Sequence, residues 1–180
     1  MRRLLLCGIL ALFICISGVS AGGNNHPDKW ALGPIFLGGY LGGYNAGGFY
    51  GGMLALKAPP IPVYWGIQLD FIDLNRQVFD AGFTGDYYVF DRMLVPGIKL
   101  GWYLGVGGFF SLSHYFGSGE WTYLNVGVRV PVALSWQPLS WLEIIGGITP
   151  CLGLHFYVAG KDGLHLNWPL VGELGARFWF

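Results

Sequence analysis

The stretch LNVGVRVPVALSW, residues 124–136, alternates large apolar residues with smaller or polar ones. Leucine, valine and tryptophan occupy every second position, and asparagine, glycine, arginine, proline, alanine and serine lie between them. A period of two that persists over thirteen residues indicates a β-strand whose two faces meet different surroundings. A strand that crosses a lipid bilayer at a tilt needs about 9 to 11 residues, so this stretch is long enough to cross one.

Seven further segments carry the same alternation, and we expect each of them to be a strand. In chain order they are residues 35–44, 47–57, 63–71, 86–95, 98–112, 142–156 and 164–180. Short proline-rich turns alternate with longer polar loops between the strands, and the longest loop runs from Asn75 to Gly85. Together these features predict an all-β fold: an eight-stranded antiparallel transmembrane β-barrel preceded by a signal peptide.

The composition supports a barrel in a membrane. Hydrophobic residues make up 53% of the chain and charged residues only 11%, yet beyond residue 21 no apolar run is long enough for a transmembrane helix. The charges of the predicted strands share one face of the sheet, and in a barrel surrounded by lipid this face must point inward. The polar network predicted for the lumen consists of Asp70, Lys99, Arg129, Glu143, Glu173 and Arg177.

This network is expected to fill the interior. An eight-stranded barrel is only just wide enough for its own side chains, and three acids and three bases can pair within it. We therefore predict a polar, largely plugged lumen. Trp179 and Phe180 are among the aromatic residues expected in a girdle at the periplasmic rim. The positive and negative residues of the chain number ten each, without a basic stripe, so nucleic-acid binding is not expected.

The first 21 residues have the form of a secretory signal peptide. Arg2 and Arg3 precede an apolar run, and Val19-Ser20-Ala21 provides a small-residue cleavage site. In the alternative interpretation, Cys15 belongs to a loose lipobox and carries a lipid. The predicted organisation is a signal peptide (1–21), a short periplasmic leader (22–33) and an outer-membrane barrel (34–180).

Two stretches resemble a known family. GVRVPV (127–132) and the closing VGELGARFWF (171–180) are similar to segments of the small outer-membrane barrels of spirochaetes, which share the eight-stranded architecture of OmpA, OmpX and OmpW. Phe178 and Phe180 resemble the terminal signal that barrel assembly machinery recognises in Gram-negative-type bacteria. The resemblance implies a porin-like, multi-pass protein of the cell outer membrane that contacts outer-membrane lipid. It carries over no catalytic residue.

Candidate chemistry is sparse. His155, Tyr157, His165 and Asn167 flank the last outer hairpin and are predicted to line the outer mouth of the barrel, as a metal-binding or proton-sensitive site or simply as a polar plug. Two histidines are fewer than the four ligands of a structural zinc site, so no metal and no cofactor are predicted. His114 lies near two serines, which leaves lipid acyl transfer as an alternative to a loop histidine.

The sequence therefore predicts a non-enzymatic, integral outer-membrane protein with a structural or surface-interaction role. The alternative is an OmpW-like narrow channel for ions or small molecules, apolar ones among them. An extracellular ligand could bind through the loop between Asn75 and Gly85, where Phe79, Asp80 and Phe83 offer contacts.

Overall fold

The computed structural model describes residues 26, 28–43, 47–72, 78–117, 119, 121–159 and 163–180. The signal peptide predicted for residues 1–21 lies outside this part of the chain. The strands are β1 (Ala31–Leu41), β2 (Gly47–Lys57), β3 (Val63–Ile72), β4 (Val78–Val95), β5 (Leu100–Tyr115), β6 (Trp121–Arg129), β7 (Val132–Leu139), β8 (Leu142–Ala159), β9 (Leu164–Asn167) and β10 (Leu170–Trp179). A 3-10 turn, η1 (Pro96–Ile98), joins β4 to β5. No helix within the described ranges is long and apolar enough to cross a membrane.

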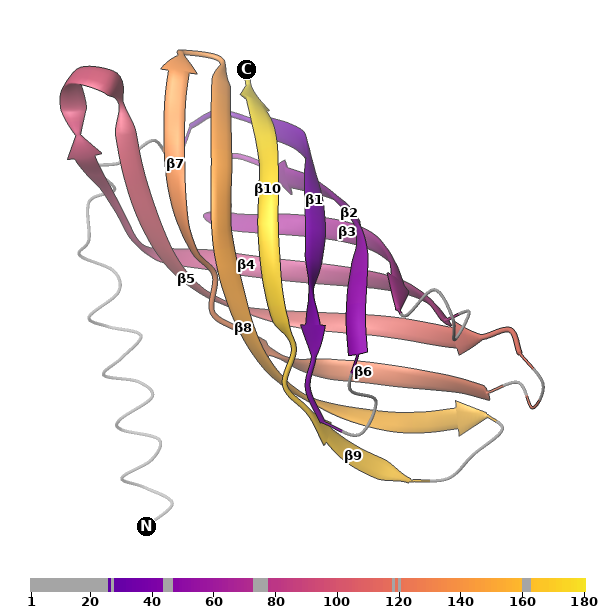
Figure 1. Cartoon of the computed structure of the whole chain (residues 1–180). Helices are drawn as coiled ribbons and strands as arrows, with labels where there is room; N and C mark the ends of the chain where they lie inside the picture. The colour runs from indigo at the N-terminus through magenta and orange to yellow at the C-terminus, as the bar shows by residue number, and fades with distance from the viewer. Residues whose placement is uncertain are drawn as a thin grey trace, which may run out of the picture.

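The strands form one antiparallel sheet that closes on itself, because β1 pairs with β10 (Figure 1). Segments β6 and β7 lie end to end, since both pair with β5 on one side and with β8 on the other. Segments β9 and β10 likewise share β8 as a neighbour. The ten segments therefore make eight barrel strands, and the prediction of an eight-stranded antiparallel barrel is confirmed.

Prolines interrupt two of the eight strands. The predicted strand 124–136 is divided at Pro131, which has no N–H to contribute to the ladder. The ladder resumes at once, because the Pro131 carbonyl accepts a hydrogen bond from Gly105 N (2.8 Å) and Val130 N donates to Pro150 O (3.0 Å). Pro169 separates β9 from β10 in the same way, and its carbonyl accepts from Cys151 N (2.8 Å). These breaks leave the barrel wall continuous.

The first half of the barrel differs from the prediction in its boundaries. The loop predicted from Asn75 to Gly85 is wrong from residue 78 onward, since Val78–Val95 is one long strand paired with both β3 and β5. The inward positions of this strand are polar, because they line the lumen. In the sequence such polar residues cannot be told apart from those of a polar loop. The surface predicted to bind a ligand there is barrel wall, apart from residues 73–77, which lie outside the described part. Strand β1 also begins earlier than predicted, at Ala31 instead of residue 35.

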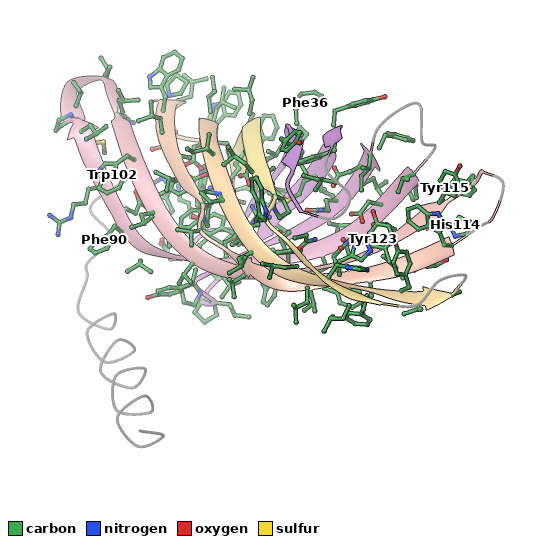
Figure 2. The ribbon with its side chains drawn as sticks, turned by 60° about the horizontal axis from the view of Figure 1, so that its bottom comes forward. Phe36, Phe90, Trp102, His114, Tyr115 and Tyr123 are labelled. Atoms are coloured by element: carbon green, nitrogen blue, oxygen red, sulfur yellow. The ribbon has the colours of Figure 1, made fainter. Side chains whose placement is uncertain are left out.

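The two faces of the sheet differ as the alternation predicts. Outward residues are large and apolar, with Phe36 70% and Ile67 61% exposed. Inward residues are buried, and many of them are polar or charged. Figure 2 shows Phe36 and Phe90 on the outside of the barrel and Tyr123 within it. An apolar exterior around a polar interior is the inverse of a soluble barrel.

The two ends of the barrel can be told apart by the residues that lie there. Trp30 and Phe180 exchange two backbone hydrogen bonds, both 3.0 Å, at the end where β1 begins and β10 finishes. We call this the terminal end. The opposite end, where Tyr115 pairs with Trp121, is called the distal end.

Candidate functional site

The candidate site is the lumen, where charged side chains are buried. Among the described residues nine such side chains are buried: Lys57, Asp70, Asp80, Asp86, Asp91, Arg129, Glu143, Glu173 and Arg177. This set contains five of the six residues predicted for the polar network. It also contains an excess of acids, with six carboxylates and three basic side chains. The balanced pairing expected from sequence is therefore wrong.

Lys99 is the predicted member that lies elsewhere. It is exposed and follows η1 at the terminal end, with a left-handed backbone (φ 54°). Strand β5 begins only at Leu100, whereas the predicted strand began at residue 98. Lys99 therefore precedes the strand, and the alternation of the strand does not apply to it. Lys57 is the base that lies in the interior instead.

The lumen is crossed near the terminal end by a layer of aromatic rings around Arg177. Tyr88 stacks on Tyr64 (ring centroids 4.2 Å apart) and on Tyr103 (4.0 Å). The Arg177 guanidinium lies 4.3 Å from the Tyr64 ring centre and donates hydrogen bonds to the hydroxyls of Tyr88 and Tyr103. We call these four residues the tyrosine layer. They come from β3, β4, β5 and β10, so the layer spans the barrel.

Glu143 completes the charge balance of the tyrosine layer. Its Oε2 lies 3.5 Å from Arg177 Nη1. It also accepts hydrogen bonds from Ser135 Oγ (2.5 Å) and Trp179 Nε1 (3.0 Å). Trp179 is therefore an inward residue, 3% exposed, and the sequence-based expectation that it lies in an aromatic girdle is wrong.

A second layer crosses the lumen at Arg129. Its Nε lies 3.1 Å from Asp86 Oδ1, and its Nη2 donates to Glu173. Thr149 Oγ1 donates to the same Glu173 carboxylate (2.8 Å). We call Arg129, Asp86 and Glu173 the arginine layer. All three side chains are nine-tenths or more buried, and a buried arginine of this kind holds its place only while both carboxylates balance it.

The leader packs into the terminal end, which the sequence did not indicate. Lys57 Nζ donates to the carbonyls of His26 (3.1 Å) and Lys29 (3.3 Å). The His26 ring contacts the Trp179 ring edge-on, with ring centroids 5.0 Å apart. Gln137 Nε2 donates a hydrogen bond to His26 Nε2 (2.8 Å). Burial, reinforced by the charge of Lys29, holds the pKa of His26 below its usual value.

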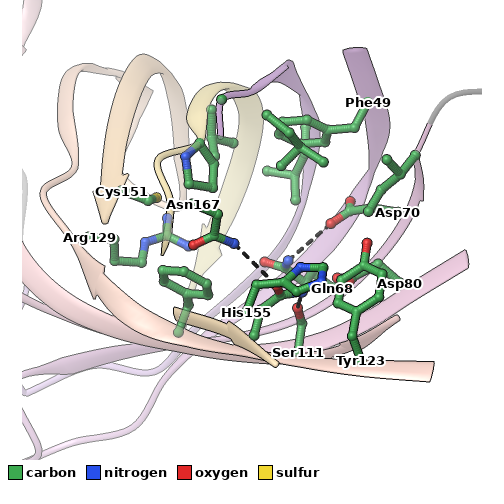
Figure 3. A pocket seen from close by; sticks show the side chains of 18 of the residues that line it. Phe49, Gln68, Asp70, Asp80, Ser111, Tyr123, Arg129, Cys151, His155 and Asn167 are labelled. Atoms are coloured by element: carbon green, nitrogen blue, oxygen red, sulfur yellow. Dashed lines mark hydrogen bonds between the residues drawn. The ribbon is translucent and has the colours of Figure 1, made fainter. Parts of the chain in front are cut away.

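On the distal side of the arginine layer lies a cavity of about 70 Å³ (Figure 3). Asp70 and Asp80 line it, together with Asn125 and Asn167. Ser113 donates to Asp80, and Asn125 Nδ2 donates to the Oγ of Ser111 (3.1 Å) and of Ser113 (3.2 Å). Gln68 Nε2 donates to Asp70 Oδ2 (3.0 Å). The cavity wall is thus a connected hydrogen-bond network.

The four residues predicted for the outer mouth do lie together at the distal side of this cavity. The rings of His155 and His165 are 5.9 Å apart, and Tyr157 lies 5.0 Å from His155. Asn167 Nδ2 donates to Asn125 Oδ1 (3.1 Å). Tyr123 was expected near the outer rim but not among these residues, and its ring stacks on His155 with centroids 3.9 Å apart. Across the described ranges, no group of three or more His, Cys, Asp or Glu side chains could hold a metal ion.

The remaining candidates lie apart from the cavity. His114 Nδ1 is 2.9 Å from Thr122 Oγ1, whereas Ser113 points into the lumen and donates to Asp80. Adjacent residues of a strand face opposite ways, so His114 and Ser113 do not form a nucleophile and base. Phe178 and Phe180, predicted as the assembly signal, are 42% and 67% exposed.

Residues 50–178 match the model of a family described as "Protein of unknown function (DUF3996)". The chain belongs to this family. No curated protein matches the DUF3996 chain in a sequence search.

Solved structures resemble its fold. Neisserial surface protein A (NspA) is 9% identical, with a TM-score of 0.54 over 84% of this chain and 97% of NspA. Ail, the attachment invasion locus protein of Yersinia pestis, is 10% identical, with a TM-score of 0.45 over 85% of this chain and 99% of Ail. A major outer membrane protein from Thermus thermophilus is 14% identical, with a TM-score of 0.37 over 84% of this chain and 99% of that protein. The DUF3996 chain therefore has the fold of small outer-membrane β-barrel proteins, while the spirochaete origin stays a prediction.

Proposed function

We propose that this DUF3996 protein is an integral, non-enzymatic barrel of the outer membrane with a plugged lumen and a structural or surface-interaction role. The tyrosine layer carries the proposal. Three stacked tyrosine rings and a buried arginine, contributed by four strands, occupy the cross-section of a barrel that is only just wide enough for side chains. A solute would have to displace all of them together.

The apolar exterior supports the membrane location. Large apolar side chains are exposed on every strand that the structure describes, for example Leu54 (49%), Val128 (56%) and Leu174 (62%). A monomeric soluble protein rarely exposes so much contiguous apolar surface. Contact of such a surface with lipid tails has no free-energy cost, whereas its exposure to water is unfavourable.

The distal end supports a role in surface contact. Tyr115 stacks on Trp121 at 5.0 Å, both are partly buried against the core, and the adjacent Phe116 is 59% exposed. Exposed aromatic residues on a rigid scaffold are typical of binding surfaces, because they bury a large area at little cost in side-chain entropy. We infer that a partner of the protein meets this aromatic rim and not the predicted loop between Asn75 and Gly85.

The narrow channel remains the alternative, and conduction decides between the two. We expect liposomes that carry the refolded protein not to swell in a graded series of small solutes, because two buried layers lie in series along the lumen. A shift in gel migration between heated and unheated samples would first establish that the barrel is folded.

A known open porin, reconstituted at the same protein-to-lipid ratio, is the positive control for swelling. Swelling that falls with solute size would contradict the plugged lumen and favour a channel. Arg129 and Arg177 would then be the residues to test for selectivity, because each is the charged centre of a layer that crosses the path.

A further inference from the structure

Two buried carboxylates, Asp70 and Asp80, line the distal cavity. Asp70 on β3 and Asp80 on β4 are directly paired in the sheet and are 3% and 4% exposed. Neither makes an ion pair with any basic side chain that the structure describes. Arg129, the base that lines the same cavity, is already bound to Asp86 and Glu173. Two like charges on paired residues are costly in a protein interior.

A second observation shows oxygen atoms that lack a partner. Asp70 Oδ1 is fully buried and receives no hydrogen bond within the described residues. A Cβ at Gly51, its partner on β2, would overlap this oxygen, so the carboxylate fits against β2 only because residue 51 has no side chain. Asn167 Oδ1, which belongs to another residue of the cavity wall, is also buried without a donor. Buried oxygen atoms in native proteins are normally paired with a protein group, a water molecule or a ligand, so these two oxygens can accept a bound species.

The geometry points to a binding site for a hard divalent cation of the calcium type in this cavity, with Asp70 and Asp80 as its charged ligands. Carboxylate and amide oxygens are the ligands that Ca²⁺ prefers, and Asn167 Oδ1 supplies an amide oxygen. Two carboxylates balance the two charges of the ion. The cavity of about 70 Å³ is large enough for the ion and some of its water.

The ligand set also argues against other metals. Transition metals prefer imidazole or thiolate ligands, and the part of the chain described here has no such cluster. Cys151 and His155 do line the cavity, but each is the single side chain of its type there. The ion would be held by two charges and several neutral oxygens, so we expect affinity in the weaker part of the calcium range, about 10⁻⁴ to 10⁻³ M.

Terbium luminescence tests the site in the folded full-length barrel. Tb³⁺ replaces Ca²⁺ at oxygen sites, and the Tyr123 ring in the cavity wall would sensitise its emission. The protein would be refolded in a glucoside detergent, which has no phosphate to bind the ion. We expect emission that Ca²⁺ displaces, and at least a tenfold loss of affinity in Asp70→Asn and in Asp80→Asn.

Asp91→Asn is the matched control, because Asp91 is also a buried carboxylate of β4 but does not line the cavity. Its terbium affinity should equal that of the wild type. If the Asp70 or Asp80 variants fail to fold, the wild type alone gives the answer, since Ca²⁺ should raise its unfolding midpoint relative to a chelator. Absence of displaceable emission, or an unchanged midpoint, would overturn the proposal and leave a proton shared by the two carboxylates as the alternative.

Discussion

Arg177 illustrates how a single residue holds this interior together. Its guanidinium is an ion-pair partner of Glu143 and lies over a tyrosine ring, and it donates to two further tyrosine hydroxyls. A planar guanidinium can make these contacts at once, whereas the compact ammonium of lysine cannot. Removal of either charge would leave the other buried without an opposite charge to balance it, which is far more costly than loss of an exposed pair.

His26 provides a residue whose behaviour with pH can be measured directly. Burial and Lys29 lower its pKa from the ordinary 6.5, so we expect an NMR titration of its ring to have a midpoint below that value. In the unfolded chain the pKa of His26 should lie near 6.5. Below that pH the unfolded state binds more protons than the folded state, and folding stability should fall as the pH drops through the folded-state pKa.

Substitution of His26 by Gln removes the titrating group. We therefore expect the denaturant midpoint of His26→Gln to change less than that of the wild type between about pH 7 and pH 5. A folded-state midpoint at or above 6.5 for His26 would show that the leader is not packed against Trp179 as described.

Buried charges were predictable where the alternation stayed regular and not where it shifted. Glu173 and Arg177 lie on the clean pattern of the last strand, and both were assigned to the lumen from sequence. Asp91 was missed because the register of β4 shifts between Tyr88 and Phe90, which moves the inward positions from even to odd numbers. Asp80 was missed because its polar surroundings were assigned to a loop. A bulge changes which face a residue occupies, and no local signal marks it.

The strands themselves were predicted best where large apolar residues alternate. The bounds of β2 match the prediction, and β3 and β8 begin at the predicted residues. The partition of two strands at Pro131 and Pro169 was not predicted, although both prolines were visible. Whether a proline ends a strand or merely interrupts it depends on the neighbouring strands, which continue the ladder on both sides of it.

The seam between β1 and β10 closes the barrel, and a glycine makes the closure possible. A Cβ at Gly33 would overlap the backbone carbonyl oxygen of Ala176 on β10. Backbone cannot move aside as a flexible side chain can, so we expect Gly33→Ala to reduce the fraction of protein that reaches the folded form. The measurement is the heat-dependent gel shift after refolding into detergent micelles.

Gly38→Ala adds the same methyl group to the same strand and serves as the control. The nearest atom to a Cβ at Gly38 is the carbonyl oxygen of Phe49, 3.9 Å away. This variant should fold as the wild type does. Equal folding yields for both variants would mean that the seam is wider than the structure describes.

At the scale of the whole molecule, the inverted arrangement of polar and apolar residues decides what the barrel can be. The described part of its interior holds nine buried charges, and its exterior carries a continuous apolar band. In water such a molecule would expose the apolar band to solvent. In lipid the band is covered by acyl chains, and the closed sheet satisfies the hydrogen-bonding groups of the backbone. The apolar exterior therefore supports the membrane location, and substitutions on that exterior can test it.

An arginine placed on the exterior should cost more at mid-barrel than at the rim if lipid surrounds the barrel. Val128 lies outward on β6, opposite Leu152 of β8, and is 56% exposed, while Leu139 lies outward at the terminal end and is 45% exposed. We expect Val128→Arg to lower the free energy of unfolding in lipid vesicles by about 2–4 kcal/mol, and Leu139→Arg by about 0–1 kcal/mol. Denaturant titrations of both variants in the same vesicles supply the comparison. Similar small effects at both positions would indicate that water, and not lipid, contacts this surface. In water the free-energy cost of an exposed arginine does not depend on its position along the barrel.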